Sequence, residues 1–260
     1  IPEPNANPDG NLQFQPALLD YNEYVGRIGI GKVHSGTLKV NEMVSCVRLD
    51  GSIKQFRIQK LFGFDGLKRV EINEAKAGDI AAVAGLMDIS VGETICNVGK
   101  EEALPILRID EPTLKMTFMV NNSPFVGKEG SIVTARKIGE RLFKETQKDV
   151  SLKVEESGNE SWVVSGRGEL HLSILIENLR REGFELQVSK PEVIIKEIDG
   201  VKCEPYEDVQ IEVSDDCVGN VIEALGLRGG KMDNTYNVPH PITLNYTIPS
   251  RGLIGFNTNF

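Results

Sequence analysis

The sequence predicts a chain of several small domains, the first all-β and the later ones α+β. Short apolar runs recur at roughly ten-residue spacing through residues 12–107, with no helical period between them. After residue 108, strands alternate with amphipathic helices, and from about residue 199 the same order begins again. The 260 residues, of which 40% are apolar, suffice for about two ordinary domains or three small ones.

Residues 1–107 are predicted to form one β domain. Turn-forming pairs, such as Asp50-Gly51 and Asp65-Gly66, separate its strands. Many short strands with turns of this kind are typical of a small barrel or sandwich. The expected strands are 12–20, 24–33, 43–48, 53–62, 79–84 and 93–98.

Residues 108–198 are predicted to form an α+β domain. A first helix over 131–147 places Ala135, Ile138 and Leu142 on one face, and a second helix continues to Gly183, a residue suited to end it. The order βαββαβ is that of a ferredoxin-like sandwich. Its strands are expected at 115–120, 151–155, 161–165, 184–189 and 193–198.

Residues 199–260 begin a second ferredoxin-like unit. The pattern predicts a strand over 208–213, a helix over 217–227, a turn at 228–230, a strand over 242–248 and the start of another element from residue 251. This unit would lack its final strand and most of its second helix. Since an exposed sheet edge is usually paired or covered, we expect the chain to be a fragment of a longer protein.

Charge and cysteine content exclude several classes of protein. The net charge of -9 argues against a nucleic-acid binder held by overall charge, although residues 108–198 carry almost half of the cations. No apolar run is long enough for a membrane span, and no signal peptide is recognisable. The scattered cysteines and histidines lack metal-site spacing, and the cysteines are expected to be buried in a cytoplasmic protein: Cys46, Cys96, Cys203 and Cys217, with His34, His171 and His240.

The stretch GRIGIGKV, residues 26–33, matches the spacing of a phosphate-binding loop. That loop needs Ser or Thr after its lysine, but this chain has Val33, and the residues that follow would not start a helix. The base-reading pattern Asn-Lys-x-Asp of a GTP site occurs nowhere in the sequence. We therefore interpret the stretch as a glycine-containing β-hairpin.

No group of residues has the pattern of a catalytic site. His171 could be proposed as a general base, but Glu169 is two residues away and so points to another side of a helix. The acidic pairs Glu155-Glu156 and Asp215-Asp216 are interpreted as solvated loop ends. We predict that this chain is not an enzyme and binds no cofactor.

A row of cations is the one pattern that indicates a binding surface. Lys137, Arg141, Lys144 and Lys148 recur at spacings of four, three and four along the first predicted helix. Such a stripe could follow RNA phosphates. The alternative is the ordinary charged outer face of an amphipathic helix, which Glu140 and Glu145 would dilute.

Three blocks of sequence resemble translational GTPases. YNEYVGRIGIGKVHSGTLKVNE and AKAGDIAAVAGL resemble the β-barrel second domain of elongation factors Tu and G. DEPTLKMTFMVNNSPFVGKEG and VSGRGELHLSILIENLRREGFELQVSKPEVIIKEIDG resemble the third domain of elongation factor G, and EPYEDVQIEV, VGNVIEALGLRGGKM and IPSRGLIGF resemble the fifth. The amino-acid sequence of these blocks is most similar to the TypA/BipA family, although residues 130–133 and 231–241 match less well.

The resemblance implies a function for the whole protein and a role for this part. The parent protein would hydrolyse GTP, with magnesium, in a G domain before residue 1, and would have a further C-terminal domain. It would bind the ribosome, act in translation under stress and assist assembly of the large subunit. This chain would contact ribosomal RNA and ribosomal proteins, as well as its own G domain and C-terminal domain, with no membrane involved.

Site residues follow from this interpretation. The barrel would transmit the nucleotide state, with linkers at 99–108 and 197–205 allowing rigid-body rotation. One rival is a stand-alone nucleotide enzyme built on GRIGIGK, and another is a regulatory module that binds a small molecule between paired ferredoxin-like domains. The candidate RNA contacts are Lys137, Arg141, Lys144, Lys148, Arg180, Arg181, Arg228 and Lys231, and the structural glycines are Gly29, Gly31, Gly36, Gly166 and Gly168.

Overall fold

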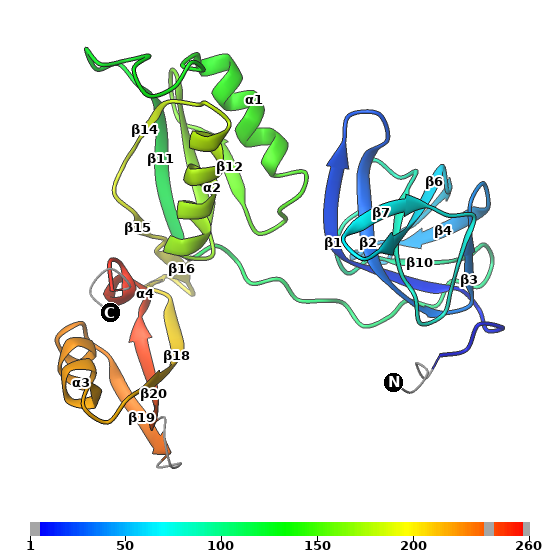
Figure 1. The fold of residues 1–260 in the computed structure, drawn as a ribbon. Helices are drawn as coiled ribbons and strands as arrows, with labels where there is room; N and C mark the ends of the chain where they lie inside the picture. The colour runs from blue at the N-terminus through cyan, green and yellow to red at the C-terminus, as the bar shows by residue number, and fades with distance from the viewer. Residues whose placement is uncertain (1–5, 237–241, 257–260) are drawn as a thin grey trace. The chain divides into compact units, whose positions relative to one another are not determined.

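The computed structural model describes residues 6–236 and 242–256. Two compact units are present: Ile1–Ile109 together with Phe143–Val150, and Asp110–Leu142 together with Ser151–Phe260 (Figure 1). Each unit is described by itself. The predicted domain boundaries, 1–107, 108–198 and 199–260, stay predictions.

The first unit is built on a twisted antiparallel sheet that surrounds a main apolar core, with a smaller apolar cluster at Ile28, Ala82 and Ala84. The strand order is β5-β4-β10-β1-β2-β9-β6-β7, and a separate pair joins β3 to β8. Phe14, Val33 and Leu38 are fully buried in its centre. The strands are β1 (Gln13–Asn22), β2 (Gly26–Ser35), β3 (Thr37–Lys39), β4 (Met43–Val47), β5 (Ile53–Arg57), β6 (Lys60–Asp65), β7 (Lys68–Glu71), β8 (Glu74–Lys76), β9 (Ile80–Ala84) and β10 (Thr94–Asn97).

The predicted strand over 53–62 is two strands in the structure. β5 pairs with β4, whereas β6 pairs with β9 and β7, so the chain changes partners between Arg57 and Lys60. Three further strands, β3, β7 and β8, were not predicted, because each has only three or four residues and lacks an apolar run.

The phosphate-loop pattern lies in the middle of this sheet. β2 contains GRIGIGKV and pairs along its length with β1 on one side and with β9 on the other, and β3 follows it rather than a helix. A Cβ atom at Gly31 would lie 1.9 Å from the carbonyl oxygen of Gln15, and one at Gly29 would lie 3.0 Å from Pro16 Cγ. The glycines therefore allow β2 to approach β1 closely beside the register shift at Pro16.

The second unit begins with a ferredoxin-like sandwich. Its main sheet has the order β12-β13-β11-β14, and β15 also pairs with β11. Helices α1 (Ala135–Glu145) and α2 (Glu169–Arg181) bury Ile138, Leu142 and Leu172 against this sheet. The strands are β11 (Leu114–Val120), β12 (Lys153–Glu156), β13 (Ser161–Gly166), β14 (Leu186–Val188) and β15 (Glu192–Val193). Glu155 and Glu156 are therefore strand residues with exposed side chains, not loop ends.

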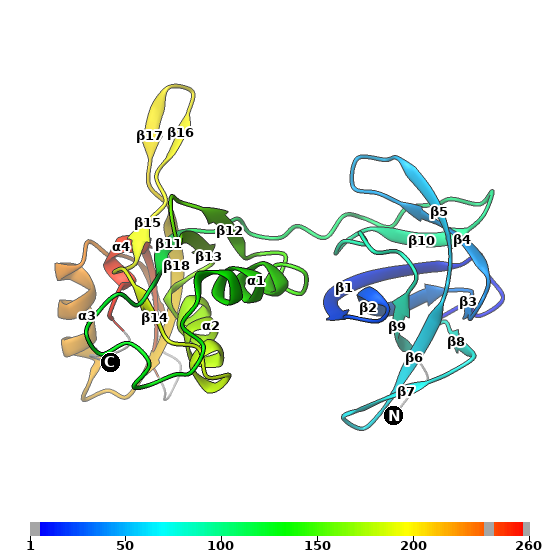
Figure 2. The ribbon, with the colours of Figure 1, turned by 90° about the horizontal axis from the view of Figure 1, so that it is seen from above.

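A hairpin connects this sandwich to the next one. Among the described residues, β16 (Lys196–Ile198) pairs with β17 (Val201–Cys203) alone, and Figure 2 shows the two strands projecting from the unit as a narrow finger. The predicted strand over 193–198 is thus divided, because β15 pairs with β11 whereas β16 pairs with β17.

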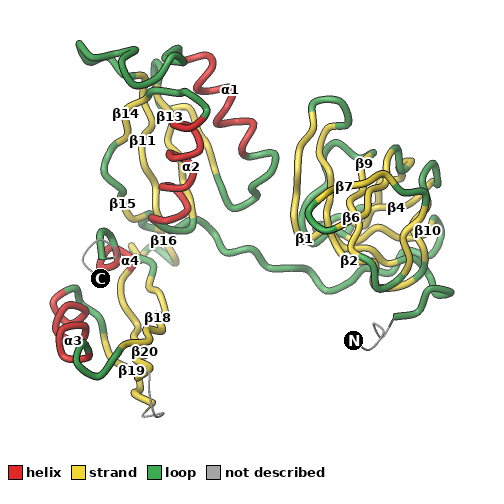
Figure 3. The backbone as a smooth tube through the Cα atoms, in the orientation of Figure 1, coloured by secondary structure: helices red, strands yellow, loops and turns green. Residues whose placement is uncertain are grey.

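The second sandwich has the element order βαββα. α3 (Val218–Leu227) packs Val221 and Leu225 on a sheet of order β18-β20-β19 (Figure 3). The strand β19 was not predicted, and residues 257–260 of the last predicted element lie outside the described residues. The elements are β18 (Tyr206–Val213), β19 (Lys231–Tyr236), β20 (Ile242–Pro249) and α4 (Ser250–Leu253). The predicted fold class, a β-barrel followed by two ferredoxin-like sandwiches of which the last is incomplete, is confirmed.

In the part of the chain that the structure describes, no helix is long and apolar enough to span a bilayer.

Replacing Gly31 with Ala should destabilise the barrel by about 2–3 kcal/mol, since the new methyl group would overlap the Gln15 carbonyl oxygen. Hydrogen exchange of the β1 and β2 amides during urea unfolding would measure the effect. Gly63→Ala is the matched control, because its methyl group would meet only the end of the Ile72 side chain at 3.2 Å. Equal stability of the two variants would contradict this account of the glycine pattern.

Candidate nucleic-acid interface

Arg141, in the centre of the predicted basic stripe, forms an intramolecular clamp. Its Nε lies 2.6 Å from Glu182 Oε2 and its Nη2 lies 2.8 Å from Glu182 Oε1, so the pair is bidentate. The Arg141 side chain is only 18% exposed. Because planar Arg–carboxylate pairs of this kind are the stronger ones, Arg141 holds α1 to the residue after α2. It is therefore poorly placed to bind phosphate.

Lys137 has the freest position in the stripe. It is exposed in the first turn of α1, and no ion pair is found for it among the residues that the structure describes. Its neighbour Arg136 pairs with Glu140 at 2.9 Å along the exposed face of the helix. Lys137 can thus reach a phosphate without breaking an ion pair within the protein.

Lys144 and Lys148 lie in residues 143–150, which belong to the first unit. Within that unit, Lys144 Nζ is 2.6 Å from Glu23 Oε1, and Lys148 Nζ is 3.3 Å from Asp20 Oδ1. The hydrogen bond from Lys144 lowers the pKa of Glu23. The four predicted stripe cations therefore differ in their contacts: Arg141, Lys144 and Lys148 form ion pairs within the protein, whereas none is found for Lys137 among the described residues.

Arg180 and Arg181 form an exposed cationic end to α2. Both guanidinium groups bind Glu177, at 2.8 and 2.7 Å, and their hydrogen bonds lower the pKa of Glu177 to about 2. The two arginine side chains are 68% and 74% exposed. Since exposed ion pairs contribute little to stability, these arginines can exchange the carboxylate for a phosphate at small cost.

Arg228 stabilises the fold of the second sandwich. Its Nη1 donates to the carbonyl oxygens of Gly252 and Ile254, at 2.8 and 3.0 Å, and its guanidinium lies 5.4 Å from the centre of the Phe256 ring. These contacts fix the segment after β20 to the end of α3. Lys231, by contrast, is exposed at the start of β19.

The loop over 121–134 was not predicted as part of a site, yet the structure holds it in one conformation. The Glu185 carboxylate accepts backbone N–H bonds from Gly127, Glu129 and Gly130, at 2.9–3.2 Å, and a side-chain bond from Asn121 at 2.6 Å. The bond from Glu129 has the largest influence and lowers the pKa of Glu185, against the opposing effect of burial. Glu185 is more than fifty residues from the loop amides that it binds, so no local sequence pattern could predict these hydrogen bonds.

The turn SGRGE positions the start of α2. A Cβ atom at Gly166 would lie 2.9 Å from Leu172 Cδ2, whereas one at Gly168 would have no atom within 4 Å. The Arg167 N–H donates to His171 Nδ1 at 3.2 Å, so this histidine takes part in the turn.

Gly36, the remaining predicted structural glycine, lies in the first unit. Its φ is +73°, and a Cβ atom there would lie 2.7 Å from Leu12 Cα, so both the backbone conformation and the close contact require glycine.

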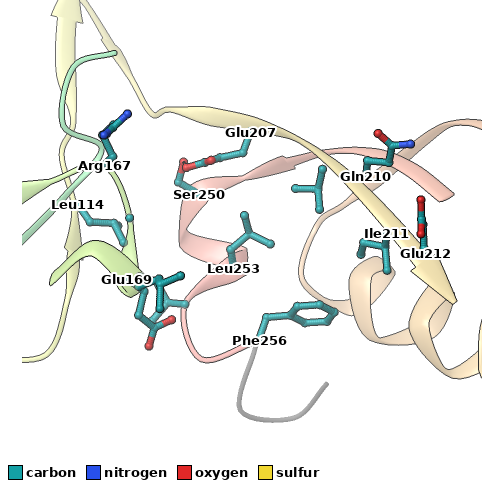
Figure 4. Close-up of a pocket in the computed structure, with 14 residues that line it drawn as sticks. Leu114, Arg167, Glu169, Glu207, Gln210, Ile211, Glu212, Ser250, Leu253 and Phe256 are labelled. Carbon is teal, nitrogen blue, oxygen red and sulfur yellow. The ribbon is translucent and has the colours of Figure 1, made fainter. Parts of the chain in front are cut away.

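A cavity of about 440 Å³ lies between the two sandwiches of the second unit (Figure 4). Apolar side chains such as Leu114, Ile211 and Phe256 line it together with the carboxylates of Glu169 and Glu207. Glu169 accepts the Gly255 N–H at 2.8 Å, and Ser250 donates to Glu207 at 2.9 Å. The bond from Gly255 to Glu169 joins the two sandwiches, whereas the bond from Ser250 to Glu207 lies within the second one. Because carboxylates outnumber the one arginine of the lining, Arg167, the cavity does not suit phosphate.

The cysteines differ from the prediction that all four are buried. All are free thiols, but Cys203 is half-buried and Cys217 is exposed at the start of α3, while Cys46 and Cys96 are buried. Burial, and then the nearby Glu93, raise the pKa of Cys46 to about 12. Across residues 6–236 and 242–256, no three or more His, Cys, Asp and Glu side chains are grouped to hold a metal ion.

Comparison with known families agrees with the observed order of domains. The family profile described as elongation factor Tu domain 2 matches residues 26–96, which span most of the barrel. The profile described as elongation factor G C-terminus matches residues 201–260, which include the second sandwich. The fold and these matches place the chain in the class of translation-factor proteins.

Relatives extend over the whole chain. It is 63% identical over 262 aligned positions to a Bacillus subtilis protein, 48% identical to one from Synechocystis and 49% identical to one from Escherichia coli K12, each named large ribosomal subunit assembly factor BipA. Each alignment covers 100% of this chain, which spans only 43–44% of the length of these relatives. The chain belongs to the BipA family.

Replacing Glu185 with Gln should loosen the loop that this carboxylate holds. Exchange of the Gly127, Glu129 and Gly130 amides should become about tenfold faster, because hydrogen bonds to a charged acceptor are replaced by weaker ones. Hydrogen exchange measured by NMR would show this, with Glu156→Gln as an exposed control.

The same loop should loosen on acidification. Because the folded-state pKa of Glu185 is lowered, its carboxylate stabilises the loop fully above about pH 4.5, and this contribution is lost as the pH falls through the lowered value. In Glu185→Gln the acid-dependent step should be absent. An unchanged step in that variant would assign it to another group.

Proposed function

We propose that this chain is the ribosome-binding, non-catalytic part of a BipA-like translational GTPase. The observation that carries the proposal is 63% identity along its whole length to a protein named large ribosomal subunit assembly factor BipA. The longer protein would act in assembly of the large ribosomal subunit and in translation under stress, in the cytoplasm. A small-molecule regulatory module is not favoured by these relatives.

The proposed division of labour follows the domains. GTP and magnesium would be held by a G domain elsewhere in the longer protein, and this chain would perform no step of GTP hydrolysis. The barrel would couple the nucleotide state of that domain to the sandwiches, which would contact ribosomal RNA and ribosomal proteins. The C-terminal domain of the longer protein would be a further partner of this chain.

The geometry narrows the candidate RNA contacts. Arg141 and Arg228 are engaged in holding the fold, whereas Lys137, Arg180, Arg181 and Lys231 are exposed. Contacts of exposed cations to phosphates set position rather than sequence preference, which fits a double-stranded or folded RNA surface. We therefore propose Lys137 with Arg180 and Arg181 as the principal phosphate contacts.

A combined Lys137→Glu and Arg180→Glu change in the longer protein should weaken binding to the large ribosomal subunit. The affinity should fall by about tenfold or more, and the slope of log affinity against log salt should decrease by about one unit for each phosphate that is no longer bound. Co-sedimentation over a salt series measures both quantities. A combined Lys39→Glu and Lys68→Glu change, at exposed residues of β3 and β7, is the charge-matched control. Equal binding of all three proteins would contradict the assignment.

A further inference from the structure

Phe125 is an aromatic side chain held in solvent. It is 64% exposed, and its neighbour Val126 is 45% exposed, in the loop that joins β11 to α1. Lys128 Nζ lies 4.8 Å from the centre of the Phe125 ring, which places a cation next to its π face. Figures 1 and 3 show the loop between β11 and α1 extending past the end of the sheet. We name residues 121–130 the aromatic loop.

Hydrogen bonds within the protein hold the aromatic loop. In addition to the four donors that meet Glu185, Val126 N–H donates to Ser123 O and Lys128 N–H donates to Phe125 O, both at 3.2 Å. Asn121 Oδ1 accepts from the Ser123 amide and from Gln187. A ring presented on such a frame binds a partner with little loss of conformational entropy.

Cationic residues are found on the elements that connect to the loop. The loop closes on the chain just after α2, where Ile132 N–H donates to Gly183 O at 3.0 Å. Glu129 is close enough to α2 to act electrostatically on Arg180. The first turn of α1, which follows the loop, contains no acidic residue but includes Arg136 and Lys137. Lys128 is thus the cation at the ring itself, and Arg180 lies within electrostatic reach of Glu129 in the same loop.

We propose that the aromatic loop binds an unpaired RNA nucleotide, with the base stacked on Phe125 and the adjoining phosphates bound by Lys128 and Arg180. An exposed ring beside cations on an ordered loop is the combination by which proteins hold single-stranded RNA. An apolar docking site for another protein would use Phe125 and Val126 but would not need the Lys128 ammonium over the ring. The inference deepens the proposed function, on which it rests for the source of the RNA.

The test separates stacking from apolar docking by comparing three side chains at one position. The full chain would be titrated against a fluorescent oligouridylate of about 12 nucleotides, within the site size of single-strand binders. Phe125→Leu and Phe125→Ala should each weaken binding about tenfold, whereas Phe125→Trp should retain it. Tyr24→Leu removes an aromatic residue that is 96% exposed in the barrel, and it should leave binding unchanged.

Other results would overturn the proposal. Oligouridylate binding that Leu supports as well as Phe, while Ala abolishes it, would show that an apolar contact and not aromatic stacking holds the base. No binding of the oligouridylate by the wild-type chain, or equal binding by all variants, would exclude stacking. Ribosome co-sedimentation, measured separately, keeps the two hypotheses apart: its absence in the wild-type longer protein would refute the proposed function, while the oligouridylate titration would still decide whether the loop binds RNA.

Discussion

Several pairs of packed elements in this chain approach each other so closely that only glycine fits at the contact. A methyl group at Gly31 would lie 1.9 Å from the Gln15 carbonyl oxygen, and one at Gly139 would lie 2.9 Å from the Trp162 ring. At Gly252 it would lie 2.6 Å from the Arg228 carbonyl oxygen. Interiors of proteins are packed too tightly to absorb such overlaps, so these residues set the distances between strand and strand, helix and sheet, and turn and helix.

Carboxylate side chains connect loops and elements that apolar packing does not hold together. Glu185 holds the aromatic loop, Glu182 clamps Arg141, and Glu169 joins the two sandwiches through the Gly255 amide. Their charges are balanced by hydrogen bonds and by neighbouring cations. The net charge of -9 is therefore a poor description of the proposed binding surface, where Lys128 lies beside the exposed Phe125 ring.

The division of the cationic stripe shows what helical spacing can and cannot predict. The spacing predicted α1 and its buried face, with Ile138 and Leu142 in the core. It could not distinguish Lys137, which is exposed, from Arg141, which binds a carboxylate 41 residues further along the chain. Both residues carry the same charge at a similar position on the helix. They differ because Arg141 lies within hydrogen-bond distance of the Glu182 carboxylate, just after α2.

The sequence by itself determined the order of α1, α2 and α3 and of most strands between them, the buried faces of these helices and the failure of GRIGIGKV to form a phosphate loop. Those properties depend on local periodicity and on the residues next to the motif. Only the tertiary structure decided which strands are divided, which cations remain available and where Phe125 stands. These properties depend on partners more than ten, and often more than forty, residues away, such as Glu185 for the aromatic loop and β9 for β6. No local pattern in the sequence records those distances.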